Sequence, residues 1–373
     1  MRLREVELRR ARMALVAPFE TSFGVQTERD ILLLKAISDA GEGWGECVAG
    51  EEPHYSPEYV DGAQDVLIHH LLPRLMDRDI AAADVPELLR PVHGHHMAKA
   101  AIEMAVLDAE LRSRGESFGH FFGAVRGEVD CGVSVGIHAA IAGLLKTVDG
   151  YVQQGYRRIK LKIKPGWDVE PVRAVRERFG EVPLQVDANT AYSITDADHL
   201  AALDPFDLLL IEQPLPEEQV LAHAKLAKIV RTPICLDESI TSAQAAADAI
   251  ELGACRIINI KPGRVGGYLE ARKIHDLCAA SHVPVWMGGM LETGIGRAGN
   301  VAMAAMPNFS LPGDTSASDR YYHRDITEPF VLHDGRLKVP AGPGLGVSVD
   351  EEFLDSITHW RHVVEGARLR PVS

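Results

Sequence analysis

Five charged residues recur along this chain at an almost constant interval of 24 or 25 positions. They are Lys162, Asp187, Glu212, Asp237 and Lys261. Each lies at or near the end of an apolar, β-prone run, and the runs are IKLKI (159–163), LQVDAN (184–189), LLLIEQ (208–213), ICLDES (234–239) and RIINIK (256–261). A repeat of about 25 residues fits one strand plus one return helix. Such units close into a barrel with its active site at the C-terminal strand ends, so the interval predicts five charged side chains in one mouth.

Three further runs bring the candidate barrel strands to eight. CGVSVGI (131–137) precedes the five periodic runs, and VPVWMGG (283–289) and NFSLPGD (308–314) follow them. The chain has 373 residues, which suits a barrel of roughly 250 residues plus a smaller domain. The expected fold class is therefore α/β, with a modified TIM barrel as its larger part.

Residues 1–125 do not follow the interval and read as an α+β domain. The expected elements are strands at 6–16 and 31–38 joined by a polar loop at 18–27, a turn, short strand and second loop within 41–59, and helices at 57–78, 84–91 and 97–114. Beyond about residue 320 the pattern becomes strand and loop again. We therefore expect three parts: an α+β domain at 1–125, the barrel at 126–320, and a segment at 321–373 that returns to the first domain.

Charge and cysteine content narrow the function and the compartment. The net charge is −14 and the pI about 5.6, which argues against electrostatic binding to nucleic acid or an anionic membrane. The sequence contains no run of 18 uncharged apolar residues, so it predicts no membrane span. The five cysteines are odd in number and form no CxxC pair, so a reduced cytoplasm is the simplest location.

Asp187, Glu212 and Asp237 offer three oxygen ligands from three successive strand ends. A hard oxygen set without Cys or His favours Mg²⁺, with Mn²⁺ or another divalent metal as a substitute. A metal bound there would stabilise the enediolate that forms when a carboxylate substrate loses its α-proton. The alternative for each carboxylate alone is capping of the next helix.

Lys162 and Lys261 come from strands on either side of the carboxylate strands, and they are candidates for an acid/base pair. A lysine must be neutral to act as a base, so its pKa must fall toward the working pH. Nearby positive charge lowers such a pKa, and Lys160 and Arg264 are the candidate neighbours. The alternative for both cations is a solvated strand end that balances the acidic site.

The motifs of this region resemble the enolase superfamily, muconate-lactonizing subgroup. The matching segments are KLKIKPGWD (160–168), VDAN (186–189), IEQPL (211–215), LDES (236–239) and IKPGRVGG (260–267). Two further segments, GGMLETGIGRAGN (288–300) and LPGDTSASDRYY (311–322), are similar to the o-succinylbenzoate synthase / N-succinylamino acid racemase family. The resemblance covers nearly the whole chain.

The resemblance implies a (β/α)7β barrel beneath an N-terminal α+β capping domain. It implies an acid/base role for Lys162 and Lys261, Mg²⁺ bound by the three carboxylates, and ligand-orienting roles for Asn189 and Glu238. Loops at 18–27 and about 47–56 would close the mouth. Weaker candidates for substrate contact, each with an alternative role in packing or turn formation, are Phe19, Phe23, Tyr55, Ser134, Gly289, Met290, Leu291, Glu292, Asp314, Thr315 and Ser316.

Two reactions of a small-molecule carboxylate share the enediolate intermediate that the resemblance implies. One is syn-dehydration to o-succinylbenzoate for menaquinone synthesis, and the other is racemisation of an N-acylamino acid; positive charge beside Lys261 favours a protein that does both. A dipeptide epimerase would carry Asp-x-Asp near 314, where only one Asp stands, and a muconate cycloisomerase shares the lysines and ligands. A non-catalytic binding barrel is the remaining alternative. Relatives suggest a homo-oligomer, with an octamer as the specific expectation.

Overall fold

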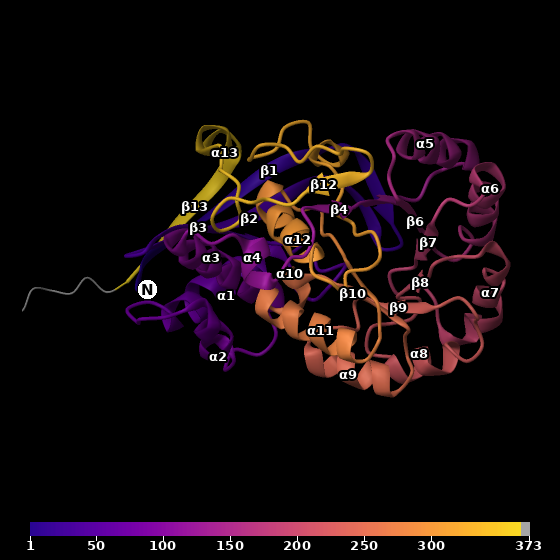
Figure 1. Ribbon diagram of the computed structural model, residues 1–373, viewed down its shortest axis with the longest axis horizontal. Coiled ribbons are helices and arrows are strands. Elements are labelled where there is room, and N and C mark those ends of the chain that lie inside the picture. Colours follow the sequence, from indigo (N-terminus) through magenta and orange to yellow (C-terminus); the bar gives the residue numbers. More distant parts are fainter. Residues whose placement is uncertain (367–373) are drawn as a thin grey trace, which may run out of the picture.

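The computed structural model describes residues 1–366, and Figure 1 shows two packed parts: a sheet with helices and a ring of strands surrounded by helices. The ring contains seven parallel strands in the order β11-β10-β9-β8-β7-β6-β5. Their bounds are β5 (Gly132–Val135), β6 (Arg158–Lys162), β7 (Leu184–Asp187), β8 (Ile211–Glu212), β9 (Ile234–Leu236), β10 (Ile257–Ile260) and β11 (Val285–Met287). Because sequence neighbours are also sheet neighbours, the periodic residues lie side by side at one rim.

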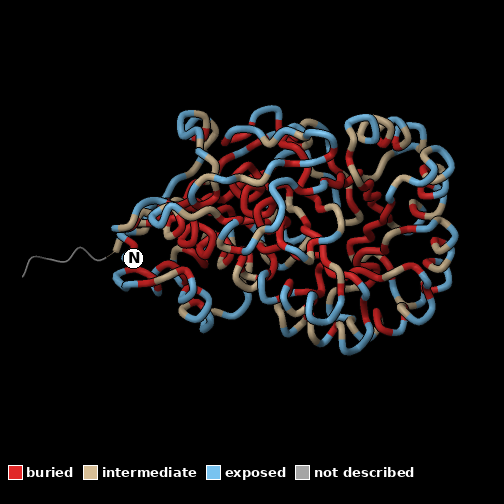
Figure 2. The backbone as a smooth tube through the Cα atoms, in the orientation of Figure 1, coloured by how far each residue is buried: buried red, intermediate tan, exposed pale blue. Residues whose placement is uncertain are grey.

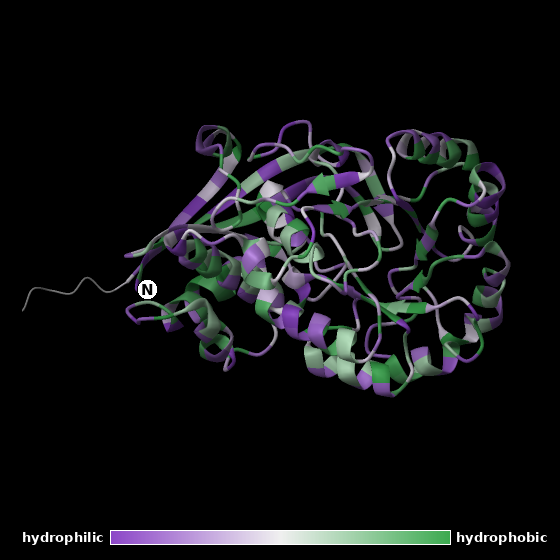
Figure 3. Ribbon diagram, in the orientation of Figure 1, coloured by the Kyte–Doolittle hydropathy of each residue, from purple (hydrophilic) through white to green (hydrophobic). Residues whose placement is uncertain are grey.

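Helices cover the outside of the ring (Figure 1). They are α5 (Ile141–Gln153), α6 (Val169–Phe179), α7 (Ala197–Ala201), α8 (Val220–Leu226), α9 (Ala243–Glu251), α11 (Tyr268–Ala280) and α12 (Gly294–Ala304). The strands are buried on both faces, as parallel strands under helices require, and most of their residues are apolar. Figure 2 shows this buried interior in red, and Figure 3 shows the same strands as mostly hydrophobic. The prediction of an α/β fold with a (β/α)7β-type barrel is confirmed.

The eighth predicted strand, at 308–314, does not form a regular strand. It closes the ring instead through two isolated bridges, Val285 to Phe309 and Cys131 to Gly313. Pro312 lies inside this segment and has no N–H to donate to a ladder, which explains why regular pairing fails here. The prediction placed the segment correctly between β11 and β5 but gave it the wrong secondary structure.

The N-terminal part is built on an antiparallel sheet in the order β13-β1-β2-β3. Its strands are β1 (Leu3–Thr21), β2 (Gly24–Ser38), β3 (Gly41–Cys47) and β13 (Thr358–Glu365). The predicted loop at 18–27 is wrong: Phe19 pairs with Gln26 and Thr21 with Gly24, so the two strands continue into a hairpin. Antiparallel pairing satisfies the backbone N–H and C=O groups that a free loop would leave to water.

Helices complete this part of the molecule. The predicted helix at 97–114 is confirmed as α3 (His96–Arg114), which ends at Gly115 with a φ of 65°. The predicted helix at 84–91 is the shorter α2 (Val85–Leu89). The predicted helix at 57–78 divides into α1 (Val60–Val66), a π-helical turn and a 3₁₀ turn that ends at Arg74. Among residues 1–366, no helix is long and apolar enough to cross a membrane.

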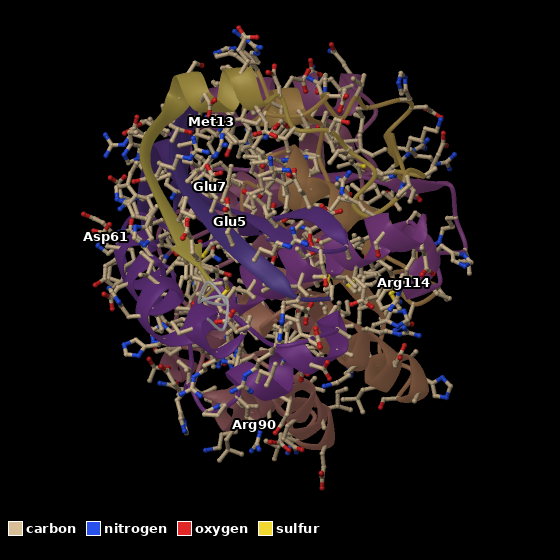
Figure 4. The ribbon with its side chains drawn as sticks, turned by 90° about the vertical axis from the view of Figure 1, so that its left-hand side faces the viewer. Glu5, Glu7, Met13, Asp61, Arg90 and Arg114 are labelled. Atoms are coloured by element: carbon tan, nitrogen blue, oxygen red, sulfur yellow. The ribbon has the colours of Figure 1, made fainter. Side chains whose placement is uncertain are left out.

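The C-terminal segment lies against both parts of the molecule. β12 (Arg336–Lys338) pairs with β4 (Glu128–Asp130) near the start of the barrel. After α13 (Glu351–Ile357), β13 pairs antiparallel with β1, and Figure 4 shows the two strands side by side where Glu5 and Glu7 are labelled. We propose that the borders near 125 and 320 divide the chain into a capping domain, a barrel and this returning segment.

The capping sheet and α3 approach each other unusually closely at two glycines of β3. A Cβ atom added at Gly45 would overlap the backbone carbonyl oxygen of Ala101, and one added at Gly43 would overlap the backbone of Ala105 and Ala109. Three alanines on the facing side of α3 permit this contact. The close fit buries the helix against the sheet that carries the hairpin over the mouth.

We expect Gly45→Ala to lower the free energy of unfolding by about 1–3 kcal/mol, because the new methyl must displace helix backbone in a filled core. Gly127→Ala is the matched control, since a Cβ there meets no atom within 4 Å. Urea unfolding followed by circular dichroism measures both. Equal midpoints for the two variants would contradict the close packing.

Two buried glutamates join the capping domain to the barrel by capping barrel helices. Glu46, on β3, accepts hydrogen bonds from the backbone N–H groups of Thr293 (3.1 Å) and Gly296 (3.0 Å) at the start of α12. Glu103, on α3, accepts from the N–H groups of Tyr268 (2.5 Å) and Leu269 (3.2 Å) at the start of α11. Free N–H groups at helix N-termini need such acceptors, so these contacts also set how the two parts are oriented.

Burial raises the pKa of Glu103 to about 8. The folded protein therefore binds this proton more tightly than the unfolded chain, whose glutamate pKa is about 4.3. Stability from this group is complete below the unfolded pKa and is lost as pH rises through the folded value. Between pH 6 and 9 we expect the wild type to lose on the order of 1–2 kcal/mol more than Glu103→Gln, which has no proton to lose.

Chemical denaturation at several pH values measures this difference. The control is Glu177→Gln, because Glu177 is exposed on α6 and its replacement leaves the pH profile as in the wild type. Parallel profiles for the wild type and both variants would show that Glu103 is ionised throughout this range.

Candidate active site

A cavity lies at the C-terminal rim of the barrel strands, with walls from both parts of the molecule. The barrel contributes Ser134, Lys160, Lys162, Asn189, Lys261, Gly289, Met290, Leu291 and Asp314, and the returning segment contributes Tyr321. The capping domain contributes Phe19, Thr21, Phe23, Gln26, Arg29, Val48, Gly50, Glu52, Tyr55 and Glu58. The cavity is therefore complete only when the capping domain sits on the barrel.

The five periodic residues lie together at this rim, as the interval predicted. Lys162 ends β6, Asp187 ends β7 and Glu212 ends β8, and these three are partners in the strand register. Asp237 follows β9 by one residue and Lys261 follows β10 by one residue. All five are buried. Parallel register is the reason that residues 25 positions apart reach the same level of the barrel.

Each lysine of the pair is bound to a different carboxylate. The Nζ of Lys162 lies 2.6 Å from Oδ2 of Asp187, and the Nζ of Lys261 lies 2.6 Å from Oδ2 of Asp237. Burial opposes the charged form of Lys261, but the neighbouring Asp237 carboxylate raises its pKa well above the usual value. Each lysine thus stands as a counter-ion at one end of the carboxylate row.

Lys160 is the central counter-ion of the site. Its Nζ lies 3.0 Å from Glu212, 3.3 Å from Asp187 and 2.6 Å from Asp314. The same ammonium group lies over the ring of Trp286 at 4.8 Å. Burial opposes its charged form, and the charges of Asp314 and Glu212 outweigh this and raise its pKa.

Asp314 uses both carboxylate oxygens inside the protein. One oxygen lies 2.6 Å from Lys160, and the other accepts a 2.8 Å hydrogen bond from Arg158. Arg158 is fully buried at the start of β6, and sequence reasoning did not single it out. The signal was present: Arg158, Lys160 and Lys162 alternate along one strand, and alternate residues share a face. Asp314 lines the cavity, but both of its carboxylate oxygens bind Lys160 and Arg158, so it orients these two cations.

Asn189 and Glu238 form a polar chain between the two ends of the site. Asn189 accepts from Lys162 Nζ at 2.6 Å and donates to Glu238 Oε1 at 2.8 Å. Arg264 donates to the backbone oxygen of Glu238 at 2.5 Å. Burial, followed by the charge of Asp237, raises the pKa of Glu238 to about 8.

Tyr55 brings a hydroxyl group from the capping domain to the second lysine. It accepts from Lys261 Nζ at 2.9 Å and donates to Asp237 Oδ2 at 3.2 Å. Lys261 and Arg264 also lie over its ring, at 5.0 Å and 5.3 Å. Phe23 packs against the same ring, with 5.6 Å between centroids. Tyr55 therefore connects the capping domain to Lys261.

The weaker candidates divide into two groups. Phe19, Phe23, Tyr55, Ser134, Gly289, Met290 and Leu291 line the cavity, and the hydroxyl of Ser134 is buried without a hydrogen-bond partner. Glu292, Thr315 and Ser316 do not line it. Glu292 accepts from Asn300 at 3.0 Å, Thr315 donates to the sulfur of Cys131 at 3.5 Å, and the Ser316 carbonyl accepts from Arg297. These partners place the three residues in the interior beside the cavity, and their contact with substrate stays a prediction.

The chemistry of the carboxylate row fits a divalent cation. Burial raises the pKa of Glu212 to about 8, and the negative charge of Asp187 adds to this effect, so the carboxylates of the row repel one another. Within residues 1–366, no three His, Cys, Asp or Glu side chains are grouped closely enough to hold an ion as they stand. The carboxylates contact lysine ammonium groups instead. Three oxygen ligands on adjacent strands are nevertheless the donor set that Mg²⁺ prefers.

Comparisons with known proteins place this fold and site in one family. Residues 3–123 match the model for the mandelate racemase / muconate lactonizing enzyme N-terminal domain, and residues 143–353 match the model for the enolase C-terminal domain-like family. The chain belongs to the enolase superfamily, whose enzymes generally use a divalent metal.

Similar proteins narrow the comparison within this superfamily. An N-succinylamino acid racemase from Amycolatopsis sp is 66% identical over 96% of this chain and 98% of its own length. An o-succinylbenzoate synthase from Geobacillus kaustophilus is 48% identical over 95% and 96%. A crystal structure of an enolase superfamily member from Listeria innocua superposes with a TM-score of 0.94, at 41% identity, over 98% of this chain and 99% of that one. A muconate cycloisomerase and a dipeptide epimerase are more distant, at 27% and 24% identity.

Proposed function

We propose that this protein removes the α-proton of a carboxylate substrate, as an o-succinylbenzoate synthase, an N-succinylamino acid racemase, or both. The observation that carries the proposal is the arrangement of Lys162 and Lys261 at opposite ends of a row of three buried carboxylates. Three strands separate β6 from β10, and the sheet curls, so the two lysines can approach a substrate carbon from opposite sides. The relatives at 66% and 48% identity carry these two activities in their names.

Asp187, Glu212 and Asp237 would hold Mg²⁺ in this proposal. When bound, the metal would polarise the substrate carboxylate and stabilise the charge that develops as the α-proton leaves. Lys160 stays beside Glu212 and Asp187 as a fixed positive charge. Asn189 and Glu238 hold Lys162 in place through their hydrogen-bonded chain.

Lys162 and Lys261 would move protons at the α-carbon. In dehydration, Lys162 would take the α-proton and then give it to the leaving hydroxyl group on the same face, which departs as water, while Lys261 acts as a cation. In racemisation one lysine takes the proton and the other returns a proton to the opposite face, so both must be able to lose their charge. Arg264 and Tyr55, which surround Lys261, would adjust its charge state and position.

The rival reactions of the superfamily receive less support from this site. A dipeptide epimerase needs a free carboxylate for the ammonium group of its substrate, but both oxygens of Asp314 bind Lys160 and Arg158. Muconate cycloisomerisation rests on a relative at 27% identity alone. We also propose that the protein is a homo-oligomer. We propose the cytoplasm as its location, because its five cysteines are buried and form no disulfide.

Proton exchange in D₂O tests the reaction directly. With Mg²⁺, we expect the wild type to exchange the α-proton of both enantiomers of N-succinylphenylalanine, measured by proton NMR, and EDTA to stop the exchange. Lys162→Ala and Lys261→Ala should each lower racemisation by at least about 10²- to 10⁴-fold, since each removes one proton carrier. Each variant should also lose exchange of a different enantiomer.

Two results would contradict this two-base scheme. Exchange that survives both lysine substitutions would place the base elsewhere. Exchange of neither enantiomer by folded wild type would exclude racemisation, and formation of o-succinylbenzoate would then decide whether the protein is a dehydratase. Melting curves with o-succinylbenzoate keep the variants interpretable, because Lys162→Ala should still be stabilised by ligand.

Tyr55→Phe tests the coupling between the capping domain and Lys261. Loss of the hydroxyl removes a hydrogen bond to the lysine ammonium, so we expect exchange of the enantiomer served by Lys261 to fall roughly 10-fold. Exchange of the other enantiomer should fall much less. Tyr59→Phe, at an exposed residue of the same loop, is the control. Equal losses for both enantiomers would mean that Tyr55 acts on closure of the cavity rather than on Lys261.

A further inference from the structure

Arg29 differs from the other cations that line the cavity. Lys160, Lys162 and Lys261 each form an ion pair with a carboxylate. Arg29, on β2, lines the same cavity and is only 4% exposed. Within residues 1–366, it forms no ion pair with a carboxylate. One guanidinium nitrogen, Nη1, donates to the backbone oxygen of Met290, and the other, Nη2, is buried without a partner.

An arrangement of this kind costs stability unless an anion completes it. An arginine cannot lose its proton in a protein, and a buried charge without a counter-ion costs several kcal/mol. The charge of Arg29 acts on the carboxylate of Glu46, but Glu46 already accepts hydrogen bonds from the N–H groups at the start of α12. Arg29 therefore remains a charged, incompletely bonded donor in the wall of the cavity.

The surroundings of Arg29 suit the end of an extended substrate that lies away from the reacting carbon. The same cavity wall includes Phe19, Thr21 and Gln26 from the hairpin and Met290, whose backbone oxygen Arg29 contacts. The acidic residues that line the same cavity are Glu52, Glu58 and Asp314, and Asp314 already pairs with Lys160 and Arg158. The reacting carboxylate belongs at the other cluster, beside Lys162 and Lys261, so a second carboxylate on the same substrate would meet a separate cation.

We propose that Arg29 binds the distal carboxylate of a dicarboxylate substrate, the terminal carboxylate of the succinyl group. The inference rests on the proposed function and adds the residue that selects succinyl substrates over acyl substrates without a terminal charge. A guanidinium group can bind a carboxylate through two parallel hydrogen bonds. Its contact with Met290 also means that the subsite contains groups from both the capping domain and the barrel.

Paired substrates test this selection. We expect Arg29→Met to lower the ratio of kcat/KM for N-succinylphenylalanine to that for N-acetylphenylalanine by roughly 10- to 100-fold, as expected for one charged hydrogen-bond partner. Arg29→Lys, which keeps the charge, should retain part of the ratio. Lys164→Met is the control for general positive charge, because Lys164 pairs with Glu20 and does not line the cavity.

Ligand binding gives a second readout that does not need turnover. With Mg²⁺, o-succinylbenzoate should raise the melting temperature of the wild type more than 2-butyrylbenzoate, which has a methyl group in place of the terminal carboxylate. Arg29→Met should remove this difference. Melting without ligand shows whether each variant is folded, and Arg29→Lys covers the case in which Arg29→Met does not fold.

The outcomes separate this inference from the proposed function. An equal fall in kcat/KM for both substrates, or an unchanged ratio, would overturn the role of Arg29 and leave the reaction in place. If the wild type acts on no N-acylamino acid and forms no o-succinylbenzoate, the proposed function fails, and the melting comparison still decides on Arg29. Equal stabilisation of the wild type by the two ligands would overturn the distal subsite.

Discussion

The structure depends on a balance of buried charge at one rim of the barrel. Five carboxylates, on Asp187, Glu212, Asp237, Glu238 and Asp314, face five cations, on Arg158, Lys160, Lys162, Lys261 and Arg264, and all ten residues are buried. Isolated charges in a protein interior cost far more than the free energy of folding, so neither set could be buried alone. The strand register brings the two sets together because it aligns residues 25 positions apart.

The capping domain covers the charged rim of the barrel and also contributes groups that contact its buried charges. Tyr55 reaches Lys261 and Asp237 from the capping side, while Glu46 and Glu103 hold the starts of α12 and α11 from the same side. A shift of the capping domain would therefore disturb helix capping and the second lysine together. In the function that we propose, specificity and chemistry would share this interface, and the choice of substrate would be linked to the state of Lys261.

Sequence reasoning found the parts of this site that repeat and missed the parts that do not. The interval located five residues because strand and helix lengths are nearly constant around the barrel. It could not show that Pro312 prevents a regular eighth strand, or that residues 18–27 continue a hairpin, because both depend on which backbone groups find partners. Arg158 lay on the same strand face as Lys160 and Lys162, so period-two alternation could have found it. Arg29 offered no local signal, since its missing counter-ion is a property of the folded cavity.

The formal charge count also explains how buried lysines could become bases. With all ten groups ionised, their formal charges sum to zero, and Lys162 and Lys261 each form an ion pair with a carboxylate. A divalent ion on the carboxylates would leave the site with two positive charges in excess. A substrate carboxylate would remove one of them, and loss of a proton from one lysine would remove the other. In the function that we propose, neutrality in a low-dielectric interior would favour a neutral lysine only when both metal and substrate are present, which would confine the base to the complex in which it is needed.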